Sequence, residues 1–131
     1  MAPAIEEAIL VHRDGTFLSR YPLLATTGVD WAAQAQSLFD VMDAVGASFH
    51  AGPGDLRDLQ FDTGTLHFTV GHVLILVTLV QGRPGAFLRR RLMNFLEDLE
   101  ERYEVALSRG RVRPEDLPEI GVYLRHLVVK S

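Results

Sequence analysis

Three consecutive arginines, Arg89, Arg90 and Arg91, are the residues of this sequence best suited to recognition chemistry. They fall in the first turns of a predicted helix, where the helix dipole makes each cation unfavourable by about 0.3–1 kcal/mol. Acidic residues crowd toward the other end of that helix, which is also the unfavourable arrangement. Two interpretations stay open: the arginines form a solvated face, or they contact an acidic protein partner. They are the candidate partner-binding residues.

The histidines raise the question of a metal site. Metal-binding pairs usually stand about two residues apart on a strand, or about three or four apart on a helix. The closest pair, His67 and His72, is five residues apart across a predicted turn. We interpret the histidines as surface or turn residues, expect His12 to orient the turn that follows it, and expect no metal. The five are His12, His50, His67, His72 and His126.

Nothing in the sequence indicates a catalytic residue. No serine stands in a Gly-x-Ser-x-Gly motif, and the absence of cysteine excludes thiol catalysis, thiolate metal sites and disulfides. The segment from Gly82 to Gly85 (GRPG) precedes a predicted helix but lacks the P-loop pattern, and the only lysine is Lys130. We interpret this segment as a strand-to-helix turn. We therefore expect a protein that is not an enzyme and that has no cofactor.

A β-hairpin opens the chain. Residues 5–12 and 16–21 predict two strands around a turn that ends at Gly15. The first strand has apolar residues on both faces, with Ile5, Ile9 and Val11 on one of them, which is typical of a central strand covered on each side.

A helix is expected after the hairpin. Asp30 is its predicted N-cap, and apolar residues repeat at helical spacing as far as Phe49. Trp31 and Phe39 belong to this stripe and face either the core or a dimer partner.

Three strands and a second helix follow. The apolar stripe of this helix predicts that it ends at Leu107 or Ser108, before a loop or single turn at 114–118. Residues 120–129 suit a helix and partly suit a strand, and we favour the helix. The three predicted strands span 56–62, 66–70 and 73–80.

These elements predict an α+β domain with a five-stranded antiparallel sheet and helices packed on it. The first and fifth strands are apolar on both faces and belong in the middle, which gives the order 2-1-5-4-3. Residues 1–131 form a single domain, with a core at about 5–108 and a C-terminal extension at 109–131.

Charge and hydropathy limit the partners of the chain. Its net charge is −4, yet residues 82–113 hold eight basic and five acidic residues, a net of +3. An acidic chain is a poor nucleic-acid binder, whereas its basic segment suits an acidic protein surface. The apolar runs are too short for membrane insertion, and no signal peptide is visible, so we expect a cytoplasmic protein.

The segment from Glu7 to Gly15 (EAILVHRDG) resembles the opening hairpin of the roadblock and longin superfamily. A prokaryotic branch with a His-Arg-Asp-Gly hairpin is more similar still, because it shares a Gly-Arg-Pro turn and an arginine-rich helix ending Glu-Glu-Arg-Tyr. Here these motifs begin at Gly82, at Arg89 and at Glu100. The resemblance covers about residues 5–105.

The resemblance implies a non-enzymatic adaptor or scaffold. Domains of this superfamily usually dimerise and serve as platforms for small Ras-like GTPases or for larger signalling or motility assemblies. The resemblance transfers no individual site residue. An alternative function is a small-ligand sensor of the PAS kind, which requires a cavity between helix and sheet.

Overall fold

The computed structural model describes residues 5–14, 16–22, 58–61 and 64–129. The helix predicted between Asp30 and Phe49, with Trp31 and Phe39, lies outside these residues, as does His50. The elements, in chain order, are β1 (Ile5–His12), β2 (Phe17–Tyr21), β3 (Asp58–Phe61), β4 (Gly64–Val70), β5 (Leu74–Val80), α2 (Ala86–Arg102), α3 (Glu104–Leu107), the 3₁₀ helix η1 (Pro114–Asp116) and α4 (Ile120–Val129).

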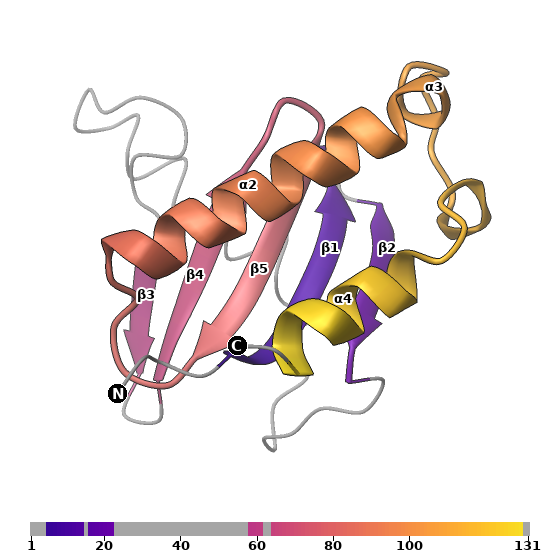
Figure 1. Ribbon diagram of the computed structural model, residues 1–131. Helices are drawn as coiled ribbons and strands as arrows, with labels where there is room; N and C mark the ends of the chain where they lie inside the picture. The colour runs from indigo at the N-terminus through magenta and orange to yellow at the C-terminus, as the bar shows by residue number, and fades with distance from the viewer. Residues whose placement is uncertain (1–4, 15, 23–57, 62–63, 130–131) are drawn as a thin grey trace.

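The strands form one antiparallel sheet in the order β2-β1-β5-β4-β3 (Figure 1). This is the order expected from the sequence, and the domain is of the α+β class. The longest ladder joins β1 to β5 in the middle of the sheet, from the Ile5–Val80 pair to the His12–Leu74 pair. The four-residue β3 forms one edge of the sheet, and β2 forms the other.

Two helices lie side by side on one face of the sheet (Figure 1). α2 crosses β4 and β5, whereas α4 crosses β1 and β2. Each helix buries an apolar stripe at helical spacing, and burying one such side chain stabilises a fold by about 1.5–3 kcal/mol. The buried residues are Leu88, Leu92, Leu96 and Leu99 of α2, and Ile120, Leu124 and Leu127 of α4.

The opposite face of the sheet is also buried. Its cluster includes Ile9 and Val11 of β1 together with apolar residues of β4 and β5. The prediction that β1 and β5 are covered on both faces is therefore confirmed. Ile5 is an exception, because it joins the cluster under the helices rather than that of Ile9. A register irregularity between Ile5 and Glu7 explains this, since one extra residue reverses the face of a strand residue.

The edge strand β2 is tied to β1 by an ion pair that the sequence did not suggest. Arg20 Nη2 lies 2.9 Å from Glu7 Oε1, and the Glu7 side chain is 1% exposed. Arg20 Nε also donates to the carbonyl of Pro22 at 3.0 Å. A buried carboxylate needs such a partner, because an unpaired buried charge is strongly destabilising.

The second helix ends earlier than its apolar stripe predicted. α2 stops at Arg102, and Tyr103 leaves the helical conformation before the short α3. The buried Tyr103 donates its hydroxyl to the carbonyl of Pro118, and its ring meets Tyr123 edge-on at 6.4 Å. These contacts join the end of α2 to α4. The prediction of a helix at 120–129 is confirmed.

The C-terminal half of α2 is attached to the β4–β5 turn by Glu100. Its carboxylate accepts backbone N–H groups from His72 at 3.2 Å, Val73 at 2.6 Å and Leu74 at 3.4 Å. A side chain on Gly71 would place its Cβ 2.2 Å from Glu100 Oε1, so the glycine leaves the room that the carboxylate occupies. Glu100 therefore fixes the position of α2 on the sheet.

Removing this carboxylate should weaken the fold. We expect Glu100→Ala to lower the free energy of unfolding by about 1–3 kcal/mol, because partly buried N–H donors lose a charged acceptor. Urea unfolding followed by circular dichroism measures the loss. The neighbouring Glu101 is exposed, and Glu101→Ala is the matched control, with an expected change within about 0.5 kcal/mol. Equal losses in the two variants would contradict the role of Glu100.

Candidate functional site

The three arginines of α2 occupy different environments. Arg89 Nη2 donates to the carboxylate of Asp58 on β3, and Arg89 Nε donates to the carbonyl of Pro84 at 3.2 Å. Arg90 and Arg91 form no ion pair with the described part of the chain. Arg89 is thus held by the sheet, whereas Arg90 and Arg91 have no ion-pair partner among the described residues. Their partner-binding role stays a prediction.

His67 completes the contact between Asp58 and Arg89. Its Nδ1 lies 2.6 Å from Asp58 Oδ1, and its side chain is 4% exposed. An ionised carboxylate only accepts hydrogen bonds, so this nitrogen carries the proton. The interpretation of His67 as a surface or turn histidine is wrong. His67 lies directly opposite Asp58 in the β3–β4 ladder, and this pairing is not visible in the sequence.

Two opposing effects act on the pKa of Asp58. Partial burial raises it, but the hydrogen bonds from His67 and Arg89 together outweigh burial and hold the pKa below its usual value of 3.8. Asp58 is therefore ionised across the physiological range. It binds one donor from the sheet and one from α2 at the same time.

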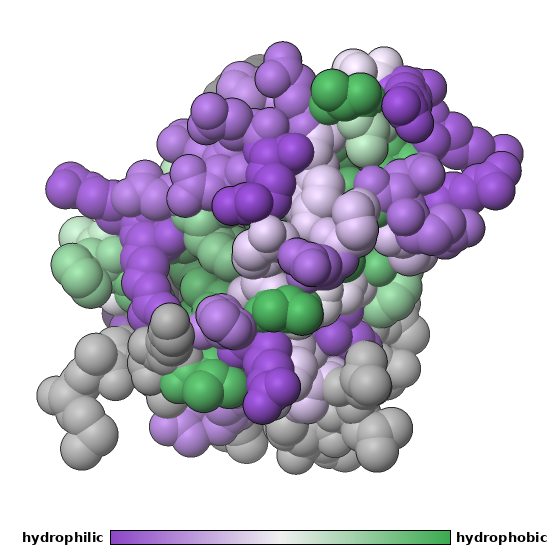
Figure 2. All heavy atoms as spheres, turned by 45° about the vertical axis from the view of Figure 1, so that its right-hand side comes forward, coloured by the Kyte–Doolittle hydropathy of each residue, from purple (hydrophilic) through white to green (hydrophobic). Residues whose placement is uncertain are grey.

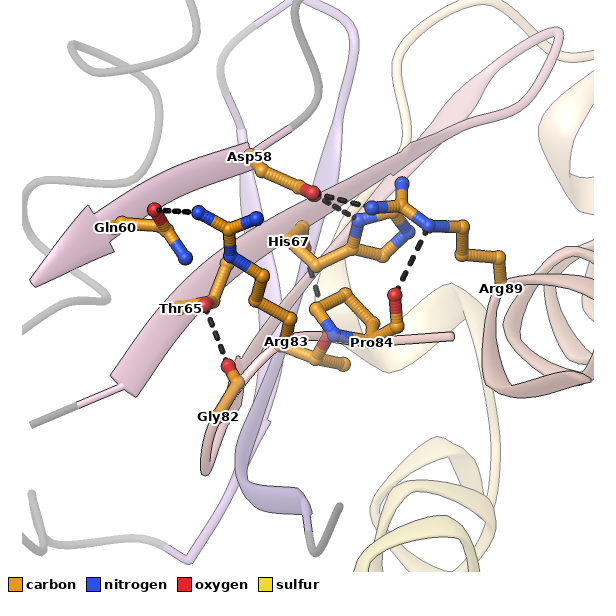
Figure 3. A network of polar contacts seen from close by, with 9 residues as sticks. Asp58, Gln60, Thr65, His67, Gly82, Arg83, Pro84 and Arg89 are labelled. Carbon is orange, nitrogen blue, oxygen red and sulfur yellow. Dashed lines mark hydrogen bonds and ion pairs between the residues drawn. The ribbon is translucent and has the colours of Figure 1, made fainter. Parts of the chain in front are cut away.

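The turn before α2 is held against the same sheet edge (Figure 3). Arg83 Nη2 donates to Gln60 Oε1 on β3 at 3.0 Å, and the Thr65 hydroxyl on β4 donates to the carbonyl of Gly82 at 2.6 Å. The strand-to-helix turn expected at this position is confirmed. Because these polar groups bind one another, the network acts as a structural tie among β3, the turn and α2.

A groove lies between α2 and α4 on the face of the sheet that carries both helices. Its volume is about 460 Å³. Figure 2 shows apolar atoms in a hollow on this side of the molecule, bordered by hydrophilic side chains. α4 contributes His126 and Leu127 to the lining. α2 contributes residues that recur every three or four positions along one side: Phe87, Arg90, Arg91, Asn94, Phe95 and Asp98.

Phe87 is the functional candidate that the sequence analysis missed. It is 84% exposed at the N-terminal end of the groove, whereas the leucines of α2 are buried. The sequence did contain a sign of its exposure, because Phe87 precedes Leu88 and falls on a different side of the helix from the leucine stripe. An exposed aromatic beside an apolar hollow is typical of an interaction surface.

Three other features of the sequence analysis concern His12, a metal site and a membrane span. His12 Nδ1 accepts the backbone N–H of Asp14 at 3.0 Å, which confirms that it orients the turn. Among the described residues, no three His, Cys, Asp or Glu side chains gather as metal ligands would. Within those same segments, none of the helices has both the length and the apolar character of a membrane span.

Comparisons with known proteins identify the fold. No protein-family model and no curated protein matches the sequence. Among solved structures, MglB of Myxococcus xanthus matches with a TM-score of 0.51 and 18% identity, over 72% of this chain and 85% of that chain. MglB has the roadblock/longin fold, and the likeness shows that this chain shares that fold.

The tie at Asp58 should make stability depend on pH. A folded-state pKa below 3.8 means that Asp58 contributes stability above this value and loses the contribution as the pH falls through the folded pKa. We expect Asp58→Asn to lower the free energy of unfolding by about 1–3 kcal/mol at pH 7, and by progressively less as the pH falls below 3.8. Urea unfolding at a series of pH values measures the difference.

The control for this experiment is Asp98→Asn, the same change at an exposed position of α2. It should have little effect at any pH. A loss at Asp58 that stays constant from pH 7 to about pH 3 would contradict a contribution from the ionised carboxylate.

Proposed function

We propose that this chain is a non-enzymatic, cytoplasmic adaptor of the roadblock/longin type, which forms a homodimer and binds a small Ras-like GTPase. The roadblock/longin fold, shared with MglB, carries the proposal. The motifs from Glu7 to Gly15, from Gly82 and from Glu100 support it, because they resemble a prokaryotic branch of the same superfamily.

The sheet edges favour assembly between copies. β3 lies at one end of the strand order, and among the described residues no strand pairs with its outer side. Exposed strand edges present unpaired backbone groups that a second chain can bind. The other edge strand, β2, exposes Phe17 by 43%. Pairing of like edges satisfies both copies and gives a closed dimer.

The dimer is tested by its mass in solution. At tens of micromolar, light scattering should give about twice the 14.6 kDa of one chain. Dilution should then lower the mass toward that of the monomer, because dimerisation follows mass action. A mass of one chain throughout the concentration series would contradict the dimer.

The free arginines of α2 support a protein partner. Arg90 and Arg91 remain unpaired within the described part of the chain, although Arg89 and Glu100 of the same helix are each held by the sheet. Paired cations on an otherwise acidic chain attract an acidic surface and raise the association rate. The net charge of −4 disfavours nucleic acid as the partner.

The GTPase is tested by capture followed by reconstitution. The tagged chain, incubated with lysate of its native host, should retain a Ras-like GTPase. The purified pair should then bind directly, with an affinity that differs between the GDP-bound and GTP-bound states, since a regulator must distinguish them. A captured GTPase that fails to bind when purified, or the absence of any GTPase, would contradict this function.

A small-ligand sensor is the second candidate. It requires an enclosed cavity between helix and sheet, but the leucines of α2 fill that space and are buried against β4 and β5. The described residues offer an open groove between helices instead. Within the described residues, the face of the sheet under α2 therefore offers a sensor no enclosed ligand site.

A further inference from the structure

We propose that the groove between α2 and α4 binds a short amphipathic helix of a protein partner, whose apolar side chains enter the groove and whose acidic side chains meet Arg90 and Arg91. This proposal concerns a surface of the chain and does not depend on the GTPase. It rests on the lining of the groove, on its charge and on its length.

The lining provides apolar contact area. Phe95 and Leu127 line the hollow from α2 and α4, and Phe87 extends the apolar surface at one end with 84% of its area in water. Leaving an aromatic side chain in water forgoes a large hydrophobic gain, and buried aromatics are the usual anchors of protein interfaces. A partner that covers Phe87 would recover this gain.

The charges select an acidic occupant. Arg90 and Arg91 line the groove without an ion pair to the described residues, in the first turns of a helix that has no acidic residue there. Each arginine is unfavourable against the helix dipole, and a carboxylate placed between them would relieve that cost. His126 adds an imidazole on the α4 side, and Asp98 is the only carboxylate among the described residues that line the groove.

The length of the groove suits a helix. Phe87 and Asp98 are eleven positions apart on α2, which corresponds to about 16 Å along the helix axis. About three turns of a helix fill this length with anchors at positions i, i+4 and i+7. A bilayer surface fits less well, because the site is concave and contains Asp98.

The test uses a phage-displayed library of helical peptides of about four turns, selected on the full-length chain. We expect enriched sequences with aromatic or aliphatic residues at i, i+4 and i+7 and with Asp or Glu beside them. The double variant Arg90→Glu, Arg91→Glu should bind these peptides at least about tenfold more weakly, and Phe87→Ala about tenfold more weakly.

The matched control is the double variant Arg109→Glu, Arg111→Glu. It makes the same charge change at two exposed arginines outside the groove, and peptide affinity should change less than about threefold. Thermal unfolding confirms that every variant remains folded, as the exposure of Phe87 and Arg90 leads us to expect.

Other results would overturn the proposal. Failure of the library to yield a binder, or peptides unaffected by the groove variants, would exclude a helix in this groove. Vesicles of phosphatidylserine and phosphatidylcholine that bind the chain, but not its Arg90→Glu, Arg91→Glu variant, while no peptide is enriched, would assign the surface to a membrane. Loss of a dimer on Phe87→Ala would assign it to a second copy.

Discussion

The position of α2 on the sheet is the constraint on which the rest of the structure depends. Its leucine stripe covers β4 and β5, and a contact at each end fixes the helix on these strands: Arg89 binds Asp58, and Glu100 binds the β4–β5 turn. Burial of leucines is non-directional and would tolerate sliding, whereas charged hydrogen bonds are directional. The two end contacts therefore decide where along the sheet the helix lies.

These contacts also explain part of an electrostatic anomaly. α2 carries its arginines and its acids at the ends that its dipole disfavours. For Arg89 and Glu100, hydrogen bonds to the sheet compensate for the unfavourable interaction with the helix dipole. A hydrogen bond to a charged group contributes more free energy than the dipole effect on an exposed residue. Arg90 and Arg91 have no such compensation within the described residues. That difference within one run of arginines leaves Arg90 and Arg91, rather than Arg89, as the candidates for binding a partner.

The same helix determines the surface next to it. α2 lies over β4 and β5, and α4 lies over β1 and β2, joined through Tyr103 and its contacts to Pro118 and Tyr123 (Figure 1). The two helices lie on the same face of the sheet, and the groove lies between them. The groove proposal follows from this arrangement, whereas the adaptor proposal rests on the fold shared with MglB.

The sequence by itself determined the class of the domain and the strand order, because these follow from apolar periodicity and from strands covered on both faces. At 120–129 it favoured a helix over a strand, and the structure has the helix. It also singled out the arginines of α2. Only the tertiary structure decided that Asp58 binds Arg89 and that His67 is buried beside Asp58. It also decided that Phe87 borders a groove. Apolar periodicity shows which face of a helix or strand is buried. The residues that a side chain contacts depend instead on strand register and helix placement, which bring residues distant in the chain together.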